Sequence, residues 1–164
     1  MTKLDPPWLI KAKSYVGLKE IPGPTHNSTI LQWLNALGAW WKDDETAWCG
    51  VFVAYCLQAG GQYPIPKLWF RAKEWSEYGS LLRPDRLAPG AILVFGRTGG
   101  GHVGFYVGED RLYYHVLGGN QSNGVNVSRI LKSRLIASRW PKGVPVVSGP
   151  VYLTPTGQVT TNEA

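Results

Sequence analysis

The stretch over residues 49–56 constrains the fold most, because it is apolar on every side of a helix. Cys49 and Cys56 share one face at helical spacing, and the residues between them make the other faces apolar as well. A helix without a polar face has to be covered by the rest of its domain. Polar residues 43–46 precede this stretch as helix caps and first-turn acids, and glycines follow at about residue 60. We therefore predict a central, buried helix.

The remaining pattern divides the chain into a helical first half and a strand-rich second half. Further helices are predicted over residues 7–18, 28–38 and 67–78, with Asn27 or Ser28 as the cap of the second. Strands are predicted over residues 91–95, 102–108, 111–117, 125–127 and 135–140. Short turns between strands imply antiparallel pairing, and helices followed by a meander predict an α+β domain.

Length and composition indicate a single globular domain. The chain has 164 residues, of which 44% are hydrophobic and only 17% charged, so it can bury one core. We expect this domain to cover residues 1–140 and to act as a monomer. Residues 141–164, rich in Pro, Gly, Val and Thr, predict an extended or loosely packed tail.

The charge of the chain favours an anionic partner without indicating nucleic acid. The net charge is +6, which would attract the protein to polyanions such as nucleic acids, anionic envelope polymers and membrane faces. The basic residues are scattered, so no nucleic-acid patch is predicted. No apolar run is long enough for stable membrane insertion, and the N-terminus lacks the apolar core of a secretory signal.

Neither cysteine is predicted to form a disulfide or to bind a metal. Cys49 and Cys56 would lie about 10 Å apart along one helix, beyond the reach of a disulfide. The sequence has no Cys-x-x-Cys pair and only three histidines, which argues against a zinc site. The acids at 43–45 could bind calcium, but helix capping is the expectation. We predict no metal and no cofactor.

Cys49 and His102 carry the features of a nucleophile and its base. The first turn of a helix presents free N–H groups and partial positive charge, which favour a thiolate at Cys49. His102 follows three glycines at the start of a strand, where a substrate or backbone can approach closely. The alternatives are a small buried hydrophobe at Cys49 and an ordinary surface histidine at 102. Cys56 lies two turns into the helix, and we expect it to be a small buried hydrophobic residue.

Four segments in order resemble the CHAP family, the cysteine, histidine-dependent amidohydrolases/peptidases. The resemblance runs from about Val16 to Trp140 and is nearest to single-domain CHAP-like lysins of phages and prophages of Gram-negative bacteria. It implies a papain-like fold, with the N-terminal helices packed on a small antiparallel sheet. The segments that carry it are Trp-Cys at 48–49, Pro-Gly-Ala-Ile-Leu-Val-Phe at 89–95, Gly-His-Val-Gly-Phe-Tyr-Val-Gly at 101–108 and Leu-Gly-Gly-Asn-Gln-Ser at 117–122.

The resemblance implies roles for individual residues. Cys49 would attack the carbonyl carbon of an amide bond, and His102 would take and return the proton. Asn120 is the best match for a third polar residue that orients the imidazole. Many CHAP enzymes carry an acidic residue just before that Asn, where this chain has two glycines.

Three further residues are expected to contact the substrate. Trp48 stands in the Trp-Cys motif, and Glu20 belongs to a Glu-Ile-Pro-Gly stretch that is similar to one in the family. Strand alternation places Gly104 on the face of His102, where a peptide could enter. The backbone N–H of Cys49 is a candidate donor to the carbonyl oxygen.

The implied function is hydrolysis of bacterial peptidoglycan, by an N-acetylmuramoyl-L-alanine amidase or a murein endopeptidase. The expected setting is an endolysin, held in the host cytoplasm until its release onto periplasmic peptidoglycan, or a virion-associated lysin. Alternatives are a non-catalytic wall- or carbohydrate-binding module that uses its tryptophans, and a carboxylate-dependent glycosidic lysin that uses acids such as Glu20 and Glu45. Deubiquitinase-like or transglutaminase-like enzymes share the Cys–His chemistry.

Overall fold

The computed structural model describes residues 5–21, 26–41, 47–97 and 99–160. Within these residues the chain is an α+β protein, with helices in its first half and most strands in its second. The α-helices are α1 (Pro7–Lys13), α2 (Ser28–Leu37) and α3 (Cys49–Gly61), and the 3-10 helices are η1 (Ala72–Glu77), η2 (Pro84–Arg86) and η3 (Lys132–Arg134). The side chain of Asn27 caps α2, as predicted, by accepting a hydrogen bond from the backbone N–H of Thr29 at 2.8 Å.

In the described part of the chain the strands form a six-stranded antiparallel sheet, in the order β1-β6-β2-β3-β4-β5. The antiparallel pairing predicted from the short turns is confirmed. The last strand returns to pair with β2, outside the meander from β2 to β5. The strands are β1 (Ser80–Leu81), β2 (Ile92–Arg97), β3 (Gly100–Glu109), β4 (Tyr113–Gln121), β5 (Gly124–Leu131) and β6 (Leu135–Trp140).

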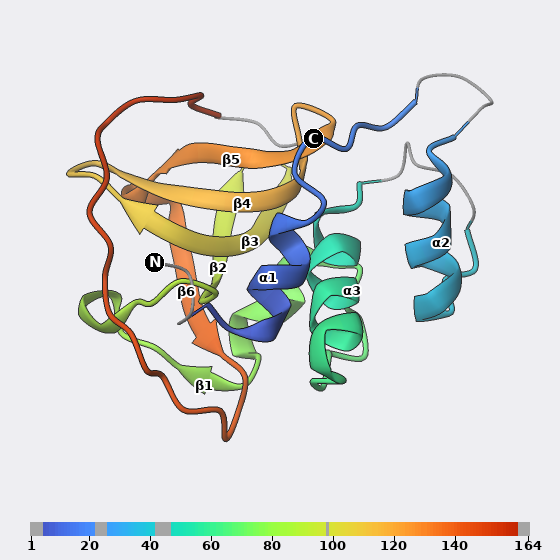
Figure 1. The fold of residues 1–164 in the computed structure, drawn as a ribbon, viewed down its shortest axis with the longest axis horizontal. Coiled ribbons are helices and arrows are strands. Elements are labelled where there is room, and N and C mark those ends of the chain that lie inside the picture. The colour runs from blue at the N-terminus through green and yellow to red at the C-terminus, as the bar shows by residue number, and fades with distance from the viewer. Residues whose placement is uncertain (1–4, 22–25, 42–46, 98, 161–164) are drawn as a thin grey trace.

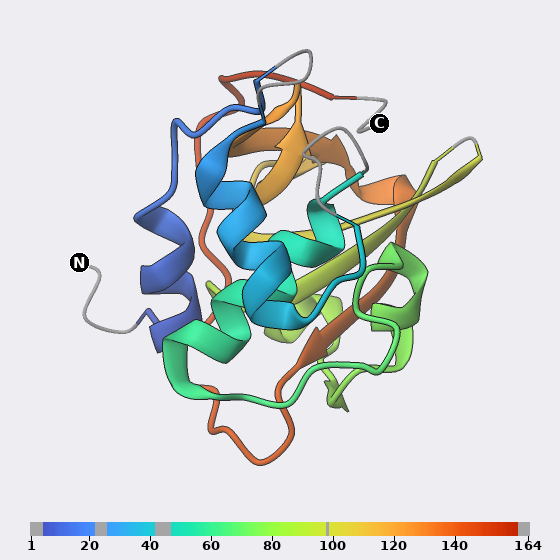
Figure 2. The same cartoon turned by 90° about the vertical axis from the view of Figure 1, so that its right-hand side faces the viewer.

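Helix α3 lies at the centre of the helical half and contacts both β3 and β4 (Figure 1). Helices α1 and α2 each pack against α3, and in the rotated view α2 lies in front of α3 (Figure 2). Residues 49–54, 56 and 57 of α3 are buried, which confirms the central helix predicted from all-round apolarity. This packing places the first turn of α3 against the middle of the sheet.

Several predicted boundaries were wrong. Helix α1 ends at Lys13, five residues early, because the chain turns there and Gly17 adopts a left-handed φ of 103°. Only residues 72–77 of the predicted fourth helix are helical, as a 3-10 helix, and the short β1 was missed. Strand β4 runs on to Gln121, beyond its predicted end at Leu117, because its pairing with β5 continues from Gly118 to Gln121.

The tail is hydrogen-bonded to the sheet over residues 151–160. Its residues 151–153 pair with Glu109 of β3, through N···O distances of 2.8 Å on both sides of Tyr152. Further along, Arg129 of β5 donates to Gln158 at 2.7 Å and accepts from Thr160 at 3.0 Å. The tail therefore joins the end of β3 to β5.

Asp110 forms a buried polar cluster below this tail. Its carboxylate lies 2.8 Å from His115 Nε2 and accepts a hydrogen bond from Arg129 Nε at 3.0 Å. It also accepts from the backbone N–H groups of Leu112 and Tyr113, so it fixes the turn between β3 and β4. Burial raises the pKa of Asp110, but the hydrogen bonds from Arg129 and His115 outweigh burial and hold that pKa at about 2.

We predict that this cluster makes the protein sensitive to acid. Because the folded pKa lies below the ordinary value of about 4, the stabilisation is complete above about pH 4 and is lost as the pH falls toward 2. Asp110→Asn should lower the free energy of unfolding by about 2 kcal/mol at pH 7, since it removes charged hydrogen bonds. Urea unfolding at several pH values measures this difference, which should shrink toward zero near pH 2.

The control for this prediction is Asp85→Asn. Asp85 pairs with Arg83 at 2.9 Å, but both side chains are about two-thirds exposed, at 66% and 65%. An exposed pair contributes little to stability. A loss of stability at Asp85→Asn equal to that at Asp110→Asn would contradict the account.

Candidate active site

Cys49 is the first residue of α3, so its sulfur lies at the end of the helix that carries free N–H groups. Gly119 of β4 packs against this end. A Cβ at Gly119 would come within 2.8 Å of the Trp48 ring and 2.7 Å of Phe52, so only glycine allows the close approach. The side chain of Cys49 keeps 5% of its surface exposed, whereas Cys56, two turns further on, has none. Both thiols are free, as predicted.

His102 lies on β3, opposite Phe95 of β2, and its side chain is fully buried. Cys49 and His102 lie close enough for the imidazole to lower the pKa of the thiol, although the two residues are 53 positions apart in the sequence. Burial raises the pKa of the Cys49 thiol, but His102 and the backbone N–H groups of Val103 and Gly50 together lower it more. The pKa of the thiol therefore lies below its ordinary value. The pKa of Cys56, in contrast, is raised well above its ordinary value by burial.

The other side of the imidazole is held by Gln121. Its Oε1 lies 2.9 Å from His102 Nε2. The amide nitrogen of Gln121 donates to the carbonyl oxygen of Val116 at 3.2 Å and to both Asn126 oxygens, at 2.8 and 3.0 Å. These acceptors surround the nitrogen, so the amide oxygen must face the ring. His102 Nε2 therefore carries a proton, and in neutral imidazole Nδ1 is then the basic nitrogen that remains for Cys49.

A β-bulge explains why Gln121 occupies this position. The resemblance to the CHAP family implies this orienting role for Asn120, one residue earlier. Strand β4 contains an extra residue between Gly118 and Gln121, and Asn120 adopts a left-handed φ of 60°. Such an insertion changes which side chains face the core. The structure thus brings Gln121, rather than Asn120, to Nε2 of His102.

Gly118 provides the space that Gln121 fills. A Cβ at Gly118 would lie 2.5 Å from Oε1 of Gln121 and 3.2 Å from Nε2 of His102. The sequence departs from the family pattern at these glycines, where many CHAP enzymes have an acid. In this chain Gln121 therefore supplies the hydrogen-bond acceptor for the imidazole, and the residues just before Asn120 are glycines that leave space for it.

Two of the residues expected to contact substrate are buried in the structure, and their contact with a substrate stays a prediction. Trp48 is 1% exposed, and its ring lies against Trp33 and Gly119. Gly104 is also buried, and a Cβ there would come within 2.5 Å of a Val116 methyl group. Burial of aromatic surface by α2, α3 and β4 explains the first case, and the close pairing of β3 with β4 explains the second.

Glu20 lies at the end of the sheet that holds the site. Its backbone N–H donates to Asn123 at 2.9 Å, and the preceding Lys19 bridges to Gly124 at the β4–β5 turn. Its side chain is half-buried. Contact of Glu20 with a substrate stays a prediction.

The acids considered for calcium, Asp43, Asp44 and Glu45, lie outside the described residues. Among the residues that the structure does describe, no three His, Cys, Asp or Glu side chains form a group that could hold a metal ion.

Asn120, Cys49 and His102 keep their catalytic roles as predictions. Gln121 was missed because strand alternation read from sequence does not reveal a bulge.

The site contains the Cys49 thiol with its lowered pKa, the His102 imidazole next to it, and the Gln121 amide that is hydrogen-bonded to the imidazole. These are the parts that nucleophilic acyl transfer by a cysteine requires. The model of the CHAP domain matches residues 41–120, which contain the Cys49 and His102 positions. This match supports the CHAP family, is consistent with a papain-like fold and indicates a peptidoglycan-related amidase or peptidase. No curated protein matches the chain.

Proposed function

We propose that this protein is a peptidoglycan hydrolase of the CHAP family that cleaves an amide bond through a cysteine nucleophile. The observation that carries the proposal is the buried group of Cys49, His102 and Gln121 at the first turn of α3, in which Gln121 Oε1 lies 2.9 Å from His102 Nε2 and His102 lowers the pKa of the Cys49 thiol. Amide hydrolysis needs a nucleophile, a proton carrier and donors for the developing oxyanion. The first two are present as side chains, and the N–H of Cys49 at the helix end supplies a donor.

In the proposed reaction, the thiolate of Cys49 attacks the carbonyl carbon of the murein amide. The proton held on His102 Nδ1 passes to the leaving amine, and an acyl-enzyme thioester remains on Cys49. His102 then takes a proton from water, which attacks the thioester and releases the acid product with the thiol restored. Gln121 keeps the ring in one orientation and one tautomer throughout. Its Oε1 can only accept a hydrogen bond, so Nε2 of His102 has to carry the proton.

Mass spectrometry of the products from purified murein sacculi tests the proposal and identifies the bond. New free amino groups without new reducing sugar ends would support an amidase or endopeptidase. An N-acetylmuramoyl-L-alanine amidase releases sugar-free stem peptides, whereas an endopeptidase releases shortened or uncrosslinked muropeptides. Reducing ends alone would favour a glycosidic lysin, and retention on the sacculi without any product would favour a binding module.

We further propose that the protein acts as a lysin of a phage or prophage of Gram-negative bacteria, as an endolysin or a virion-associated enzyme. In this proposal the protein stays in the host cytoplasm until it reaches periplasmic peptidoglycan, and it works as a monomer. Its net charge of +6 supports attraction to an anionic envelope. None of the helices in the described residues is long and apolar enough to cross a membrane.

A further inference from the structure

Four aromatic side chains form a continuous group beside α3, which we call the aromatic wall. Trp41 lies at its centre, with ring centroids 5.3 Å from Trp40, 5.9 Å from Trp69 and 5.6 Å from Phe70. Trp69 and Phe70 also pack edge to face at 5.5 Å. The wall joins the segment after α2 to the segment before η1, so it draws together two parts of the chain that are distant in sequence.

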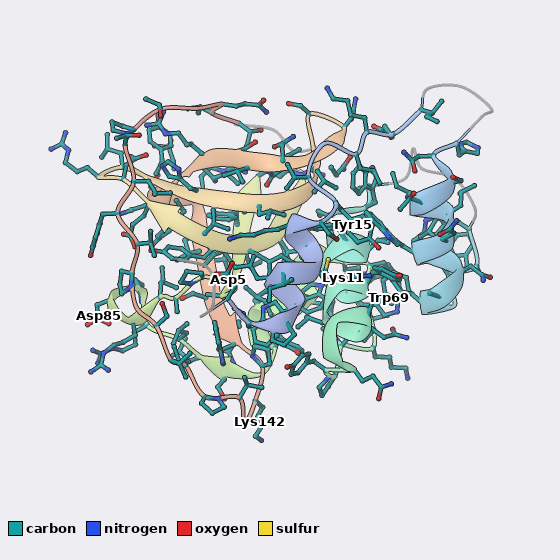
Figure 3. The ribbon with its side chains drawn as sticks, viewed as in Figure 1. Asp5, Lys11, Tyr15, Trp69, Asp85 and Lys142 are labelled. Atoms are coloured by element: carbon teal, nitrogen blue, oxygen red, sulfur yellow. The ribbon has the colours of Figure 1, made fainter. Side chains whose placement is uncertain are left out.

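The aromatic wall adjoins the candidate active site through its backbone. A Cβ at Gly50 would clash with the carbonyl oxygen of Trp69, so this carbonyl lies directly against the residue after Cys49. The same oxygen accepts a hydrogen bond from Trp75 Nε1 at 3.0 Å, which fixes the segment. Figure 3 shows Trp69 beside α3, on the side that faces α2.

The chain segment that follows Trp69 and Phe70 reaches the neighbour of His102, the second catalytic candidate. The side chain of Lys73 packs so closely on Gly101, the residue before His102, that a Cβ there would lie 2.9 Å from it. Residues 69–73 therefore border the chain neighbours of both Cys49 and His102. The aromatic wall thus lies on the segment that runs between the two catalytic candidates.

The wall presents a large apolar surface to solvent at one position. Trp69 is 9% exposed, but Trp40 is 85% exposed, and its ring packs edge to face on Trp41. Core packing does not explain a tryptophan that is almost fully in water. An exposed aromatic ring that continues a packed aromatic group beside a candidate site offers an apolar surface to a ligand.

The proposed substrate has one component that fits such a surface. Murein stem peptides consist of small and charged residues, which offer little to an indole ring. The glycan strand consists of N-acetylated pyranose rings, whose C–H faces and acetyl methyl groups pack on aromatic rings, while their hydroxyl groups stay in water.

We propose that the aromatic wall binds the glycan strand of murein, with Trp40 as the exposed stacking platform. The inference rests on the proposed function, because it takes murein as the substrate. It deepens that function: the enzyme recognises its amide bond together with the neighbouring sugars. Sugar-free peptides are accordingly poor substrates even when they contain the scissile bond.

Binding of a soluble tetramer of β-1,4-linked N-acetylglucosamine tests the wall separately from catalysis. Calorimetry with Cys49→Ala should detect binding, and the double variant Cys49→Ala/Trp40→Ala should bind at least about fivefold more weakly. Tyr152→Ala is the matched control, because Tyr152 is 76% exposed but lies on the tail. In the Cys49→Ala background it should bind as Cys49→Ala does. Undetectable binding by Cys49→Ala, or equal affinities with and without Trp40, would overturn the proposal.

Steady-state kinetics then show whether Trp40 affects KM or kcat. Trp40→Ala in the otherwise unchanged enzyme should raise KM for sugar-bearing muropeptides about tenfold, with kcat nearly unchanged, since it removes binding shared by ground and transition states. Its kcat/KM for a D-lactyl stem peptide, which lacks the sugar rings but keeps the lactyl–L-alanine amide and the peptide bonds, should equal that of the unsubstituted enzyme. Equal losses on both substrates would contradict a glycan site. If the unsubstituted enzyme releases no product from sacculi, the proposed function fails, while the oligosaccharide result still decides whether the wall binds sugar.

Discussion

Replacing Cys49 by alanine should lower the rate of product release from murein sacculi by at least about 10³-fold, because it removes the sulfur that forms the acyl intermediate in the proposed reaction. Cys49→Ser should be almost as inactive. Its hydroxyl keeps the polar contact with His102, but at neutral pH it does not ionise as the thiol does. Release of free amino groups over time measures both variants.

Cys56→Ala is the matched control for this prediction. Cys56 lies in the same helix, is fully buried and has a pKa raised well above its ordinary value, so it has no features of a nucleophile. This variant should keep its activity, with a modest loss of stability from the small cavity. Circular dichroism and thermal melting establish that each variant folds. A folded Cys49→Ser protein with unchanged activity would exclude the cysteine mechanism.

Gln121→Leu should lower kcat about 100-fold and leave KM nearly unchanged. Leucine has a similar volume but cannot accept the hydrogen bond from Nε2, so the imidazole loses its fixed orientation and tautomer. A role limited to folding would instead change the melting temperature without lowering kcat per folded molecule. Steady-state kinetics on soluble muropeptides, with melting curves as a reference, separates the two.

Asn120→Gly is the comparison variant, because glycine accepts the left-handed φ of 60° at this position. If Gln121 orients the imidazole, Asn120→Gly should retain activity within about threefold, since it leaves that hydrogen bond in place. The assignment made from sequence predicts the reverse order of effects. A larger loss at Asn120 than at Gln121 would restore the original assignment and contradict the one drawn from the geometry.

The central helix and the Cys49–His102 pair were predictable because they depend on local signals. All-round apolarity identified α3 as buried, and the thiol in its first turn identified a candidate nucleophile. The glycines before His102 indicated a strand that another group approaches closely. These signals depend on residue type and spacing, which the sequence gives directly.

The imidazole partner and the aromatic wall were not predictable, because they depend on tertiary structure. One extra residue in β4 turns Gln121 toward His102, and the alternation that indicates a strand gives no sign of such an insertion. Trp48, which adjoins the nucleophile in sequence, is buried by neighbours that only the fold supplies. The wall likewise brings Trp40 and Trp69 together through Trp41, although α3 separates them in the sequence. No spacing rule relates these two positions.

The most direct test of the account is the pH titration of the Cys49 thiolate, followed by its ultraviolet absorbance in Cys56→Ala protein with and without His102→Ala. With His102 present, the thiolate should form at a pH below the ordinary cysteine pKa, because the imidazole outweighs the effect of burial. Without it, burial should raise the pKa above the ordinary value. The same pKa in both proteins would contradict the claim that His102 activates Cys49.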